Sequence, residues 1–474
     1  MNLSHNSSRR DFLKKSGLAT LGLAGAGALS QSHAKTPRRI RQPASGKAKS
    51  IIFLVSDGMS AGTLSMADNF LRFRDGRPSH WMNMYDRYPV HRGLMEMASQ
   101  NSVVTDSAAA ASSWGCGQRV PNGRINVDVG GAEREPILAI AKRNGLRAGL
   151  VTTATVTHAT PAGFAANGPS RGNEQLFAKQ YYERGYDVIL GGGQRIFDAS
   201  RRDDGLDLPA MFQGKDYAYV TDRDGLLAQA GDQGKLLGLF SGSHVPYEID
   251  RLNSDDLGKV PSLAEMSKAA LQALHRSGDG FIMQIEGARV DHAAHRNDIS
   301  GLIYDQIAFD DALAVALKYY EHNPDTLIIV TTDHGNGSPS LNAGQPLGAN
   351  TLGKLADFKC SVSSLRPGLD ANSSVEMIRN RFEEFTQLTL SDSQVAAIIN
   401  RLNGSWRHPY ERMNQTVLTI ASVLANHLQI SWSTHTHTAE FVELAAVGPG
   451  SERIKPLTRN YELFDIMRKA IDIG

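Results

Sequence analysis

Cysteine is almost absent from this sequence, with only Cys116 and Cys360 among 474 residues. They could form one bridge at most or remain free thiols, so a disulfide framework does not hold the fold together. An excess of one charge is also lacking, because 50 Lys and Arg offset 49 Asp and Glu. Residues 50–474 contain no apolar run near the roughly 20 residues that cross a bilayer. The 41% of hydrophobic residues is typical of a globular protein.

The N-terminal segment has the features of an export signal. Paired arginines, Arg9 and Arg10, precede a short apolar run rich in Gly and Ala, Leu18 to Leu29. This order is typical of a twin-arginine signal, whereas about 12 weakly apolar residues are too few for the alternative, a membrane anchor. We therefore expect residues 1–34 to be a signal peptide and 35–49 a disordered linker. The mature protein should have no membrane span and be periplasmic or secreted.

The charge distribution argues against nucleic acid as a partner. Residues 1–49 hold ten Lys or Arg and one Asp, which leaves 40 basic and 48 acidic side chains in residues 50–474. An acidic body offers no electrostatic footprint for a phosphate backbone. We therefore expect no nucleic-acid binding.

From Ser50 onward, short β-branched runs alternate with amphipathic segments. Five runs end at polar residues or glycine, as buried parallel strands do: Ile51–Ser56, Ala148–Thr153, Asp187–Leu190, Phe281–Ile285 and Thr326–Thr332. Apolar residues at helical spacing predict helices over Glu135–Arg143, Leu263–Leu274 and Leu302–Tyr320. This alternation predicts an α/β fold, a three-layer α/β/α sandwich with a large, mostly parallel central sheet. In the last helix we expect Asp305, Asp310 and Asp311 to form a solvated face.

Residues 338–433 interrupt this alternation. They open with a stretch rich in Gly, Asn and Pro, and helical patterns follow over Ser374–Leu402 and Thr416–Leu428. We interpret residues 50–474 as one domain and 338–433 as a cap inserted into it.

Carboxylates and an imidazole follow two of the predicted strands. Asp57 comes directly after one strand and precedes Gly58, while Asp333 and His334 come after another. An Asp-Gly pair alone is an ordinary turn. In an α/β sandwich, however, ligands bind beyond the carboxyl ends of the strands. Two carboxylates and one imidazole there would suit zinc and leave coordination open for water or substrate.

Further acids and imidazoles follow later strands. Asp291 and His295 are four residues apart, so on a helix they share one face. They are either a pair of metal ligands or an ordinary ion pair on a solvated helix. His435 and His437 precede an apolar run and could be ligands or part of an exposed strand edge.

Asp106 and Ser107 begin an alanine-rich segment. They form a helix N-cap, and the same geometry favours an alkoxide or a phosphate at the helix start. No Gly-x-Ser-x-Gly motif surrounds Ser107, so a conventional Ser-His-Asp hydrolase is not supported. A metal ion on its oxygen would make this serine reactive.

With these residues in place, the sequence resembles the alkaline phosphatase family of the dinuclear-zinc, serine-nucleophile type. The resemblance runs in order from Ile51 to about Pro449. Its motifs are Asp57-Gly58-Met59, Asp106-Ser107-Ala108, Ala159–Ala162 with Arg171, Glu286–His295, Asp333-His334, and His437 with Ala445–Pro449.

The resemblance implies two Zn²⁺ ions and one Mg²⁺ ion. It places Asp291, His295 and His437 on one zinc and Asp57, Asp333 and His334 on the other. The magnesium would take Asp57, Thr160 and Glu286. His435 remains an alternative to His437. So many neighbouring carboxylates need cations, which supports metal binding on chemical grounds.

The resemblance also implies the reaction and the groups that bind the substrate. Ser107 would attack a phosphate monoester and become phosphorylated before inorganic phosphate is released. Arg171 would clamp the phosphate, with Asp106 beside it. His158 and His292 would lie near the substrate, at positions where relatives have Asp and Lys or His, so the identity of the third metal stays open.

Two alternatives to this function remain. A phosphodiesterase or sulfatase could use the same sheet, although Ser107 lacks the surroundings of a sulfatase nucleophile. A non-catalytic exported protein could use metals for stability alone, but sites with three protein ligands each leave coordination open, unlike structural zinc sites. The expected partners are small phosphate monoesters, and the chain could form a homodimer.

Overall fold

The computed structural model describes residues 46–474, apart from 230, 232, 277 and 343–348. The predicted signal peptide and most of the predicted linker lie outside the described residues. The end of that linker belongs to the folded body, because Ala48 N donates to Ala470 O and Lys49 N donates to Asp325 O. Within the described part of the chain, no helix is long and apolar enough to span a bilayer.

A ten-stranded sheet forms the centre of the fold, in the order β14-β2-β13-β8-β1-β7-β3-β4-β6-β5. Only β13 runs against the other strands, as its antiparallel pairing with β2 and β8 shows. The strands are β1 (Ser50–Ser56), β2 (His91–Glu96), β3 (Arg147–Thr155), β4 (Val188–Gly192), β5 (Ala218–Val220), β6 (Leu236–Leu239), β7 (Phe281–Gly287), β8 (Thr326–Thr331), β13 (Val442–Val447) and β14 (Leu457–Arg459). The mostly parallel sheet and all five predicted strands are confirmed.

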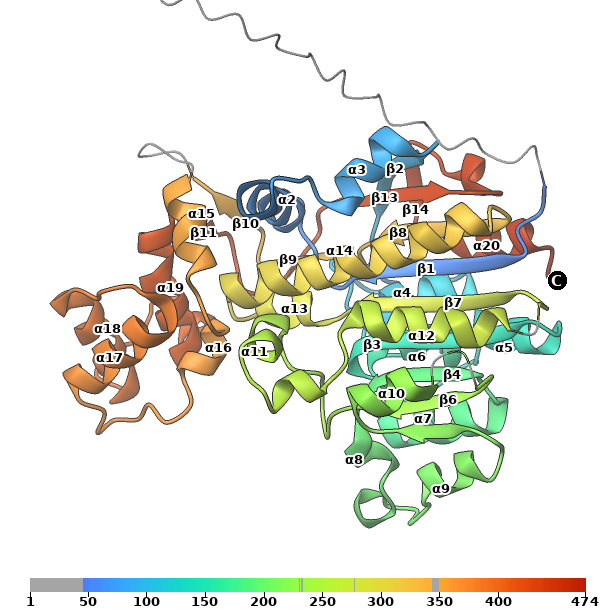
Figure 1. The fold of residues 1–474 in the computed structure, drawn as a ribbon, viewed down its shortest axis with the longest axis horizontal. Helices are drawn as coiled ribbons and strands as arrows, with labels where there is room; N and C mark the ends of the chain where they lie inside the picture. The colour runs from blue at the N-terminus through green and yellow to red at the C-terminus, as the bar shows by residue number, and fades with distance from the viewer. Residues whose placement is uncertain (1–45, 230, 232, 277, 343–348) are drawn as a thin grey trace, which may run out of the picture. The chain divides into compact units, whose positions relative to one another are not determined.

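Helices cover both faces of the sheet (Figure 1). Alternate residues of β1 point to opposite faces: Ile52 and Leu54 join one core, and Ile51 and Phe53 join the other. The first core also takes residues from α2 (Ala61–Asp75), α3 (His80–Arg87), α11 (Glu248–Leu252), α12 (Leu263–His275), α13 (Arg289–Ala294) and α14 (Ile299–His322). The second takes residues from α4 (Ser107–Cys116), α5 (Ile137–Arg143), α6 (Ala159–Ala165), α7 (Glu174–Arg184), α8 (Gln194–Phe197), α9 (Leu208–Gln213) and α20 (Glu462–Ile471).

The three-layer sandwich is therefore confirmed, with the three predicted helices present as α5, α12 and α14. Short elements complete the body: α10 (Arg223–Gln229), η1 (Ala199–Arg201), η2 (Leu257–Lys259) and η4 (Ser451–Arg453). Cys116 and Cys360 are buried free thiols.

The predicted solvated face of α14 is wrong for two of its three acids. Asp305 and Asp310 are buried, whereas Asp311 is partly exposed. Asp310 accepts hydrogen bonds from the first backbone amides of α3, His80 N (2.7 Å) and Trp81 N (2.9 Å). Neighbouring helices surround α14, so a position that faces away from the sheet is still covered by protein.

Residues 338–433 form a helical segment whose two ends pair with each other. β10 (Pro339–Leu341) and β11 (Ile430–Trp432) make an antiparallel two-stranded sheet at its base. The enclosed elements are α15 (Ala349–Ala356), α16 (Val362–Leu365), α17 (Val375–Thr386), α18 (Asp392–Leu402), η3 (Glu411–Met413) and α19 (Thr416–Leu428). α17 and α18 replace one predicted long helix, because Gln387 ends α17 in a left-handed conformation and Ser391 caps α18.

Two carboxylates of the body hold this segment. Asp298, the N-cap of α14, also accepts hydrogen bonds from Val362 N (2.9 Å) and Ser363 N (2.8 Å) at the start of α16. Asp250 accepts from Ser361 N at 2.7 Å. One buried acid thus accepts from N-terminal amides of two helices, α14 and α16, and its loss would loosen both.

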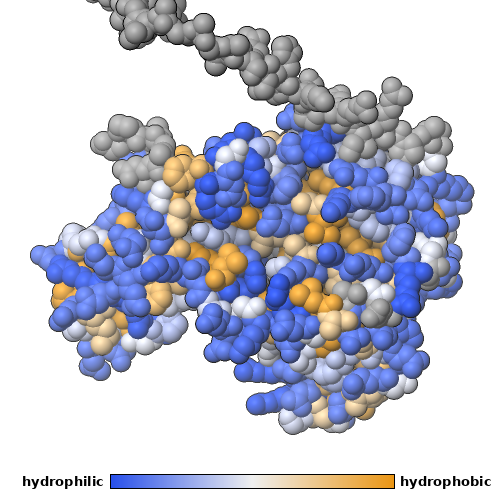
Figure 2. Space-filling view, viewed as in Figure 1, coloured by the Kyte–Doolittle hydropathy of each residue, from blue (hydrophilic) through white to orange (hydrophobic). Residues whose placement is uncertain are grey.

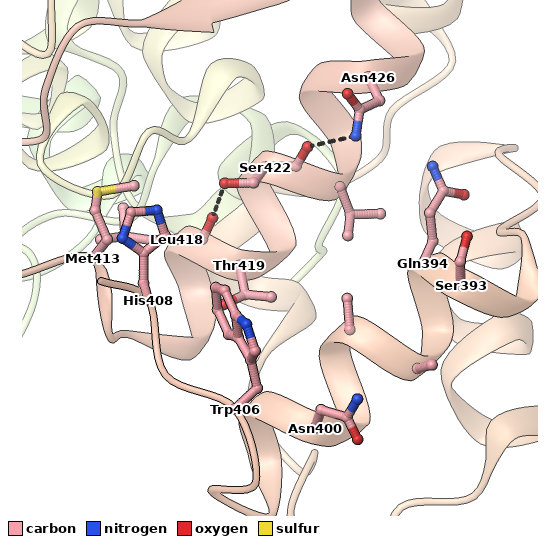
Figure 3. Close-up of a pocket in the computed structure, with 13 residues that line it drawn as sticks. Ser393, Gln394, Asn400, Trp406, His408, Met413, Leu418, Thr419, Ser422 and Asn426 are labelled. Atoms are coloured by element: carbon pink, nitrogen blue, oxygen red, sulfur yellow. Dashed lines mark hydrogen bonds between the residues drawn. The ribbon is translucent and has the colours of Figure 1, made fainter. Parts of the chain in front are cut away.

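The surface shown in Figure 2 is mainly hydrophilic, with apolar residues in separate patches. One hollow of about 640 Å³ lies within the 338–433 segment, between α18 and α19. Trp406 and Met413 contribute to its apolar lining (Figure 3). None of the residues lining this hollow is a predicted catalytic or metal-binding residue.

Candidate active site

The register of the central strands brings the predicted ligands together. Glu286 on β7 and Thr331 on β8 both lie beside Val55 of β1. Asp57 therefore emerges next to Glu286 on one side and to Asp333 on the other. All three carboxylates are almost completely buried.

The turn after β1 has no room for a side chain. Gly58 has φ +68°, and a Cβ atom there would lie 2.5 Å from Asp291 Oδ1. Gly58 N donates to Asp333 Oδ1 at 3.0 Å, which links the ends of β1 and β8. The Asp-Gly pair is thus a turn, and its glycine also lets Asp291 approach the backbone closely.

Asp57, Asp333 and His334 form the first candidate metal group. His334 Nε2 lies 3.1 Å from Asp333 Oδ2 and 3.7 Å from Asp57 Oδ1. The imidazole is fully buried. One ion could contact both carboxylates and this ring.

Asp291, His295 and His437 form the second group. His295 Nε2 lies 3.3 Å from Asp291 Oδ2 and 3.1 Å from His437 Nε2. The Nδ1 atoms of the two rings face carbonyl oxygens, His435 O at 2.9 Å and Thr105 O at 3.0 Å. These contacts orient both Nε2 atoms toward Asp291, as second-shell partners of metal-bound histidines do. His437 lies in the group, whereas His435 contributes its carbonyl oxygen.

A third group combines Asp57 and Glu286 with His158. Thr160 Oγ1 lies 3.5 Å from Asp57 Oδ2, so the predicted magnesium ligands do meet. His158 was predicted to lie near the substrate and to leave the identity of the third metal open, and its ring lies beside these carboxylates. Its Nδ1 atom is buried without a hydrogen-bond partner in the described part of the chain.

Ser107 begins α4, and Asp106 is the N-cap of that helix. Asp106 Oδ1 accepts from Ala109 N at 2.9 Å, and its Oδ2 accepts from Arg171 Nη1 at 3.2 Å. Ser107 Oγ lies 3.3 Å from His334 Nε2, the atom available to the first metal group. The structure therefore brings the serine, the arginine and that group to one place.

The charge balance of this region calls for cations. Asp57 Oδ1, Glu286 Oε1 and Asp333 Oδ2 are buried without a hydrogen-bond partner among the described residues. Burial and repulsion from Asp333, Asp291 and Glu286 hold the pKa of Asp57 well above its usual range. Burial raises the pKa of Glu286 to about 7. Divalent ions would supply the missing positive charge, so these residues fit metals with oxygen and imidazole ligands.

The ring of His158 lies beside Arg171, and two further imidazoles, His244 and His292, lie against His158. The three ring centroids are 4.5 to 5.6 Å apart, and His158 Nε2 is 3.3 Å from Arg171 Nη2. Burial and the positive charge of Arg171 lower the pKa of His158 to about 3. Burial and Arg289 lower the pKa of His244 to about 4. Burial and the positive charge of Arg289 also hold the pKa of His292 well below its ordinary value, so all three rings are neutral near pH 7.

His244 was not predicted. It lies in the loop after β6, a strand too short and too weakly patterned to be recognised in the sequence. The rule that ligand-binding residues lie beyond the carboxyl ends of parallel strands, which pointed to Asp57 and Asp333, would also have pointed to His244 if β6 had been recognised.

Together, the sandwich, the buried carboxylate and imidazole groups and the serine at a helix start define a metal-dependent hydrolase. Comparisons with known proteins identify the family. The alkaline phosphatase family profile matches residues 48–473, so the chain belongs to this family and is a phosphomonoesterase. This assignment favours monoester hydrolysis over the diesterase, sulfatase and non-catalytic alternatives.

Three relatives illustrate the match. Alkaline phosphatase 3 of Bacillus subtilis is 29% identical over 442 residues, which cover 89% of each chain. The repressible alkaline phosphatase of Saccharomyces cerevisiae is 31% identical and covers 85% of this chain and 76% of its own. The crystal structure of Thermus thermophilus alkaline phosphatase superposes with a TM-score of 0.84 at 33% identity, covering 96% of both chains.

Proposed function

We propose that Ser107 is the nucleophile of this phosphomonoesterase and forms a covalent phosphoserine. The observation that carries the proposal is the position of Ser107 Oγ, 3.3 Å from His334 Nε2 and at the N-terminus of α4. The helix dipole favours negative charge on both the serine oxygen and the phosphoryl group.

The side chains around Ser107 have separate roles. In the first half-reaction, the Ser107 hydroxyl loses its proton and Oγ bonds to phosphorus, while the bond to the ester oxygen breaks and that oxygen gains a proton. In the second half, a water molecule loses a proton and its oxygen bonds to phosphorus, while the bond to Ser107 Oγ breaks, Oγ regains a proton and inorganic phosphate leaves. Arg171 holds two phosphoryl oxygens with its planar guanidinium, and Asp106 fixes the guanidinium. His158 and His292 border the substrate.

The first and second groups would each hold one Zn²⁺, since they offer carboxylates and imidazoles with coordination left open. When bound, such ions lower the pKa of a hydroxyl group and stabilise charge on attacking and leaving oxygens. The second half-reaction needs a deprotonated water molecule, so activity should rise toward alkaline pH.

Asp57, Glu286 and Thr160 would hold Mg²⁺ through oxygen atoms. His158 offers a nitrogen to the same group, which suits zinc or another transition metal better than magnesium. Metal analysis of the purified enzyme and of the His158→Asp variant tests whether the third site holds magnesium or a transition metal. Magnesium in both proteins supports the proposal, whereas a transition metal at the third site that is lost in the variant overturns it.

Phosphoenzyme trapping tests the role of Ser107. Acid quenching with a ³²P-labelled substrate should label the enzyme on Ser107 and leave Ser107→Ala unlabelled. Metal content measured in parallel should remain near that of the unmodified protein. Label persisting in the variant would assign the nucleophile to another residue.

The remaining proposals concern location, assembly and the inserted segment. The Arg9-Arg10 leader supports export by the twin-arginine route to the periplasm or beyond, and the double substitution Arg9→Lys with Arg10→Lys should block that export.

Residues 338–433 would act as a cap that controls access to the site, and the chain would assemble as a homodimer. Light scattering measures the mass of the assembly and so tests the homodimer. Deletion of residues 343–427 tests the cap, because it should raise kcat/KM for large phosphate monoesters more than for small ones.

A further inference from the structure

Arg289, His244 and His292 form a group of hydrogen-bond donors, which we call the donor cluster. Arg289 Nη1 lies 2.9 Å from His292 Nδ1, and Thr155 N lies 3.2 Å from His244 Nδ1. A guanidinium and a backbone amide can only donate, so both Nδ1 atoms accept. An imidazole that accepts at Nδ1 carries its proton on Nε2, so each ring offers one Nε2–H donor.

The remaining donors of the cluster are free. Within the described part of the chain, neither of the two Nε2 atoms nor Arg289 Nη2 has a hydrogen-bond partner, and both histidines are partly exposed residues. The guanidinium is held 3.7 Å above the ring of Tyr247, so it is positioned without using these donors.

Arg289 also lacks an ion-pair partner among the described residues. No described carboxylate lies within ion-pair distance of it. The charge of Arg289 acts on Asp305 only at a distance, and this carboxylate accepts a hydrogen bond from Glu248 N at 3.1 Å. The donor cluster therefore offers donors and positive charge without an acceptor, a combination that selects an anion with several oxygens.

The cluster adjoins the catalytic centre. His292 follows Asp291 directly, and the ring of His158 lies 5.6 Å from the rings of both His244 and His292. His158 in turn contacts Arg171. One imidazole thus separates the donor cluster from the phosphate clamp, which places an anion there within reach of a small substrate's leaving group.

We propose that Arg289, His244 and His292 bind a second phosphate group, carried by the leaving group of the substrate. This inference rests on the proposed function of Ser107 and Arg171. A phosphate suits the cluster because its three terminal oxygens can meet donors from three different residues. The enzyme should therefore favour small bisphosphates and similar doubly phosphorylated substrates over monophosphates of the same skeleton.

The test compares propane-1,3-diol bisphosphate with propane-1,3-diol monophosphate by following phosphate release. Arg289→Met and His244→Phe should each lower kcat/KM for the bisphosphate by roughly tenfold or more, mainly through KM, because each removes a charged or polar contact. The monophosphate should change by less than about twofold. His244→Phe retains the aromatic ring, which guards against loss of packing.

Arg296→Met is the matched control, because it removes a nearby positive charge that lies outside the cluster and contacts the hydroxyl of Tyr247. An equal loss in this control, or equal losses for both substrates in the cluster variants, would overturn the proposed subsite.

A second readout is competitive inhibition by methylenediphosphonate. This inhibition should weaken in both cluster variants, whereas inhibition by methylphosphonate should not change. Unchanged inhibition by the diphosphonate would also overturn the subsite. If Ser107→Ala still forms a phosphoenzyme, the proposed function fails instead, whatever the substrate preference.

Discussion

Asp310 offers a test of how burial controls stability in this fold. Burial raises the pKa of its carboxyl group from the ordinary 3.8 to about 6, although His80 N and Trp81 N donate to it. Because the folded-state pKa is raised, the acid favours folding when protonated. This contribution is lost as pH rises from about 4 through about 6. A difference of about two pKa units corresponds to about 3 kcal/mol at neutral pH.

Asp310→Asn removes the titration and keeps one acceptor for the two amides. Below pH 4 the variant and the unmodified protein should have similar free energies of unfolding, since both side chains are neutral. Near pH 7.5 the variant escapes the roughly 3 kcal/mol that ionisation costs the unmodified protein, and this figure already includes the two amide hydrogen bonds because they act on the folded-state pKa. The difference between the two proteins should therefore shift in favour of the variant as pH rises.

Urea unfolding from pH 4 to pH 8, with both proteins at equal metal concentration, measures this difference. Other groups that titrate, including the metal ligands, cancel in the comparison. A difference that is independent of pH would show that Asp310 has an ordinary pKa and that its burial does not oppose ionisation.

Three further predictions concern the site and its surroundings. Gly58→Ala should lower metal content and the thermal midpoint, since the new Cβ atom would lie 2.5 Å from Asp291 Oδ1; retention of full metal content would contradict this close approach. Arg171→Lys should lower kcat/KM on p-nitrophenyl phosphate at least about tenfold, because one ammonium cannot replace the bidentate guanidinium proposed to hold the phosphate. Asp298→Ala should speed proteolysis within residues 338–433, because the first two amides of α16 lose their acceptor; unchanged cleavage would mean that these hydrogen bonds do not hold the segment.

Position relative to a strand was the most informative feature of the sequence. Asp57, Asp333 and His334 were predicted as metal ligands because they follow runs with a clear β-branched pattern, and the structure brings them together as one candidate metal group. The burial of Asp305 and Asp310 was not predictable in the same way. Amphipathic spacing assigns one buried face to a helix, whereas α14 is covered on several sides by helices from distant parts of the sequence. Such contacts depend on the whole fold.

The register of the sheet explains how residues so far apart in sequence form one site. Val55 pairs with Glu286 on one side and with Thr331 on the other, so both flanking strands end level with β1. Asp57, Glu286 and Asp333 therefore meet without help from long loops. A slip of one residue in either pairing would turn the ligand to the opposite face of the sheet. The hydrophobic alternation that builds the two cores consequently also sets the geometry of the metal groups, and a substitution in β1 that alters register should cost metal binding before it unfolds the protein.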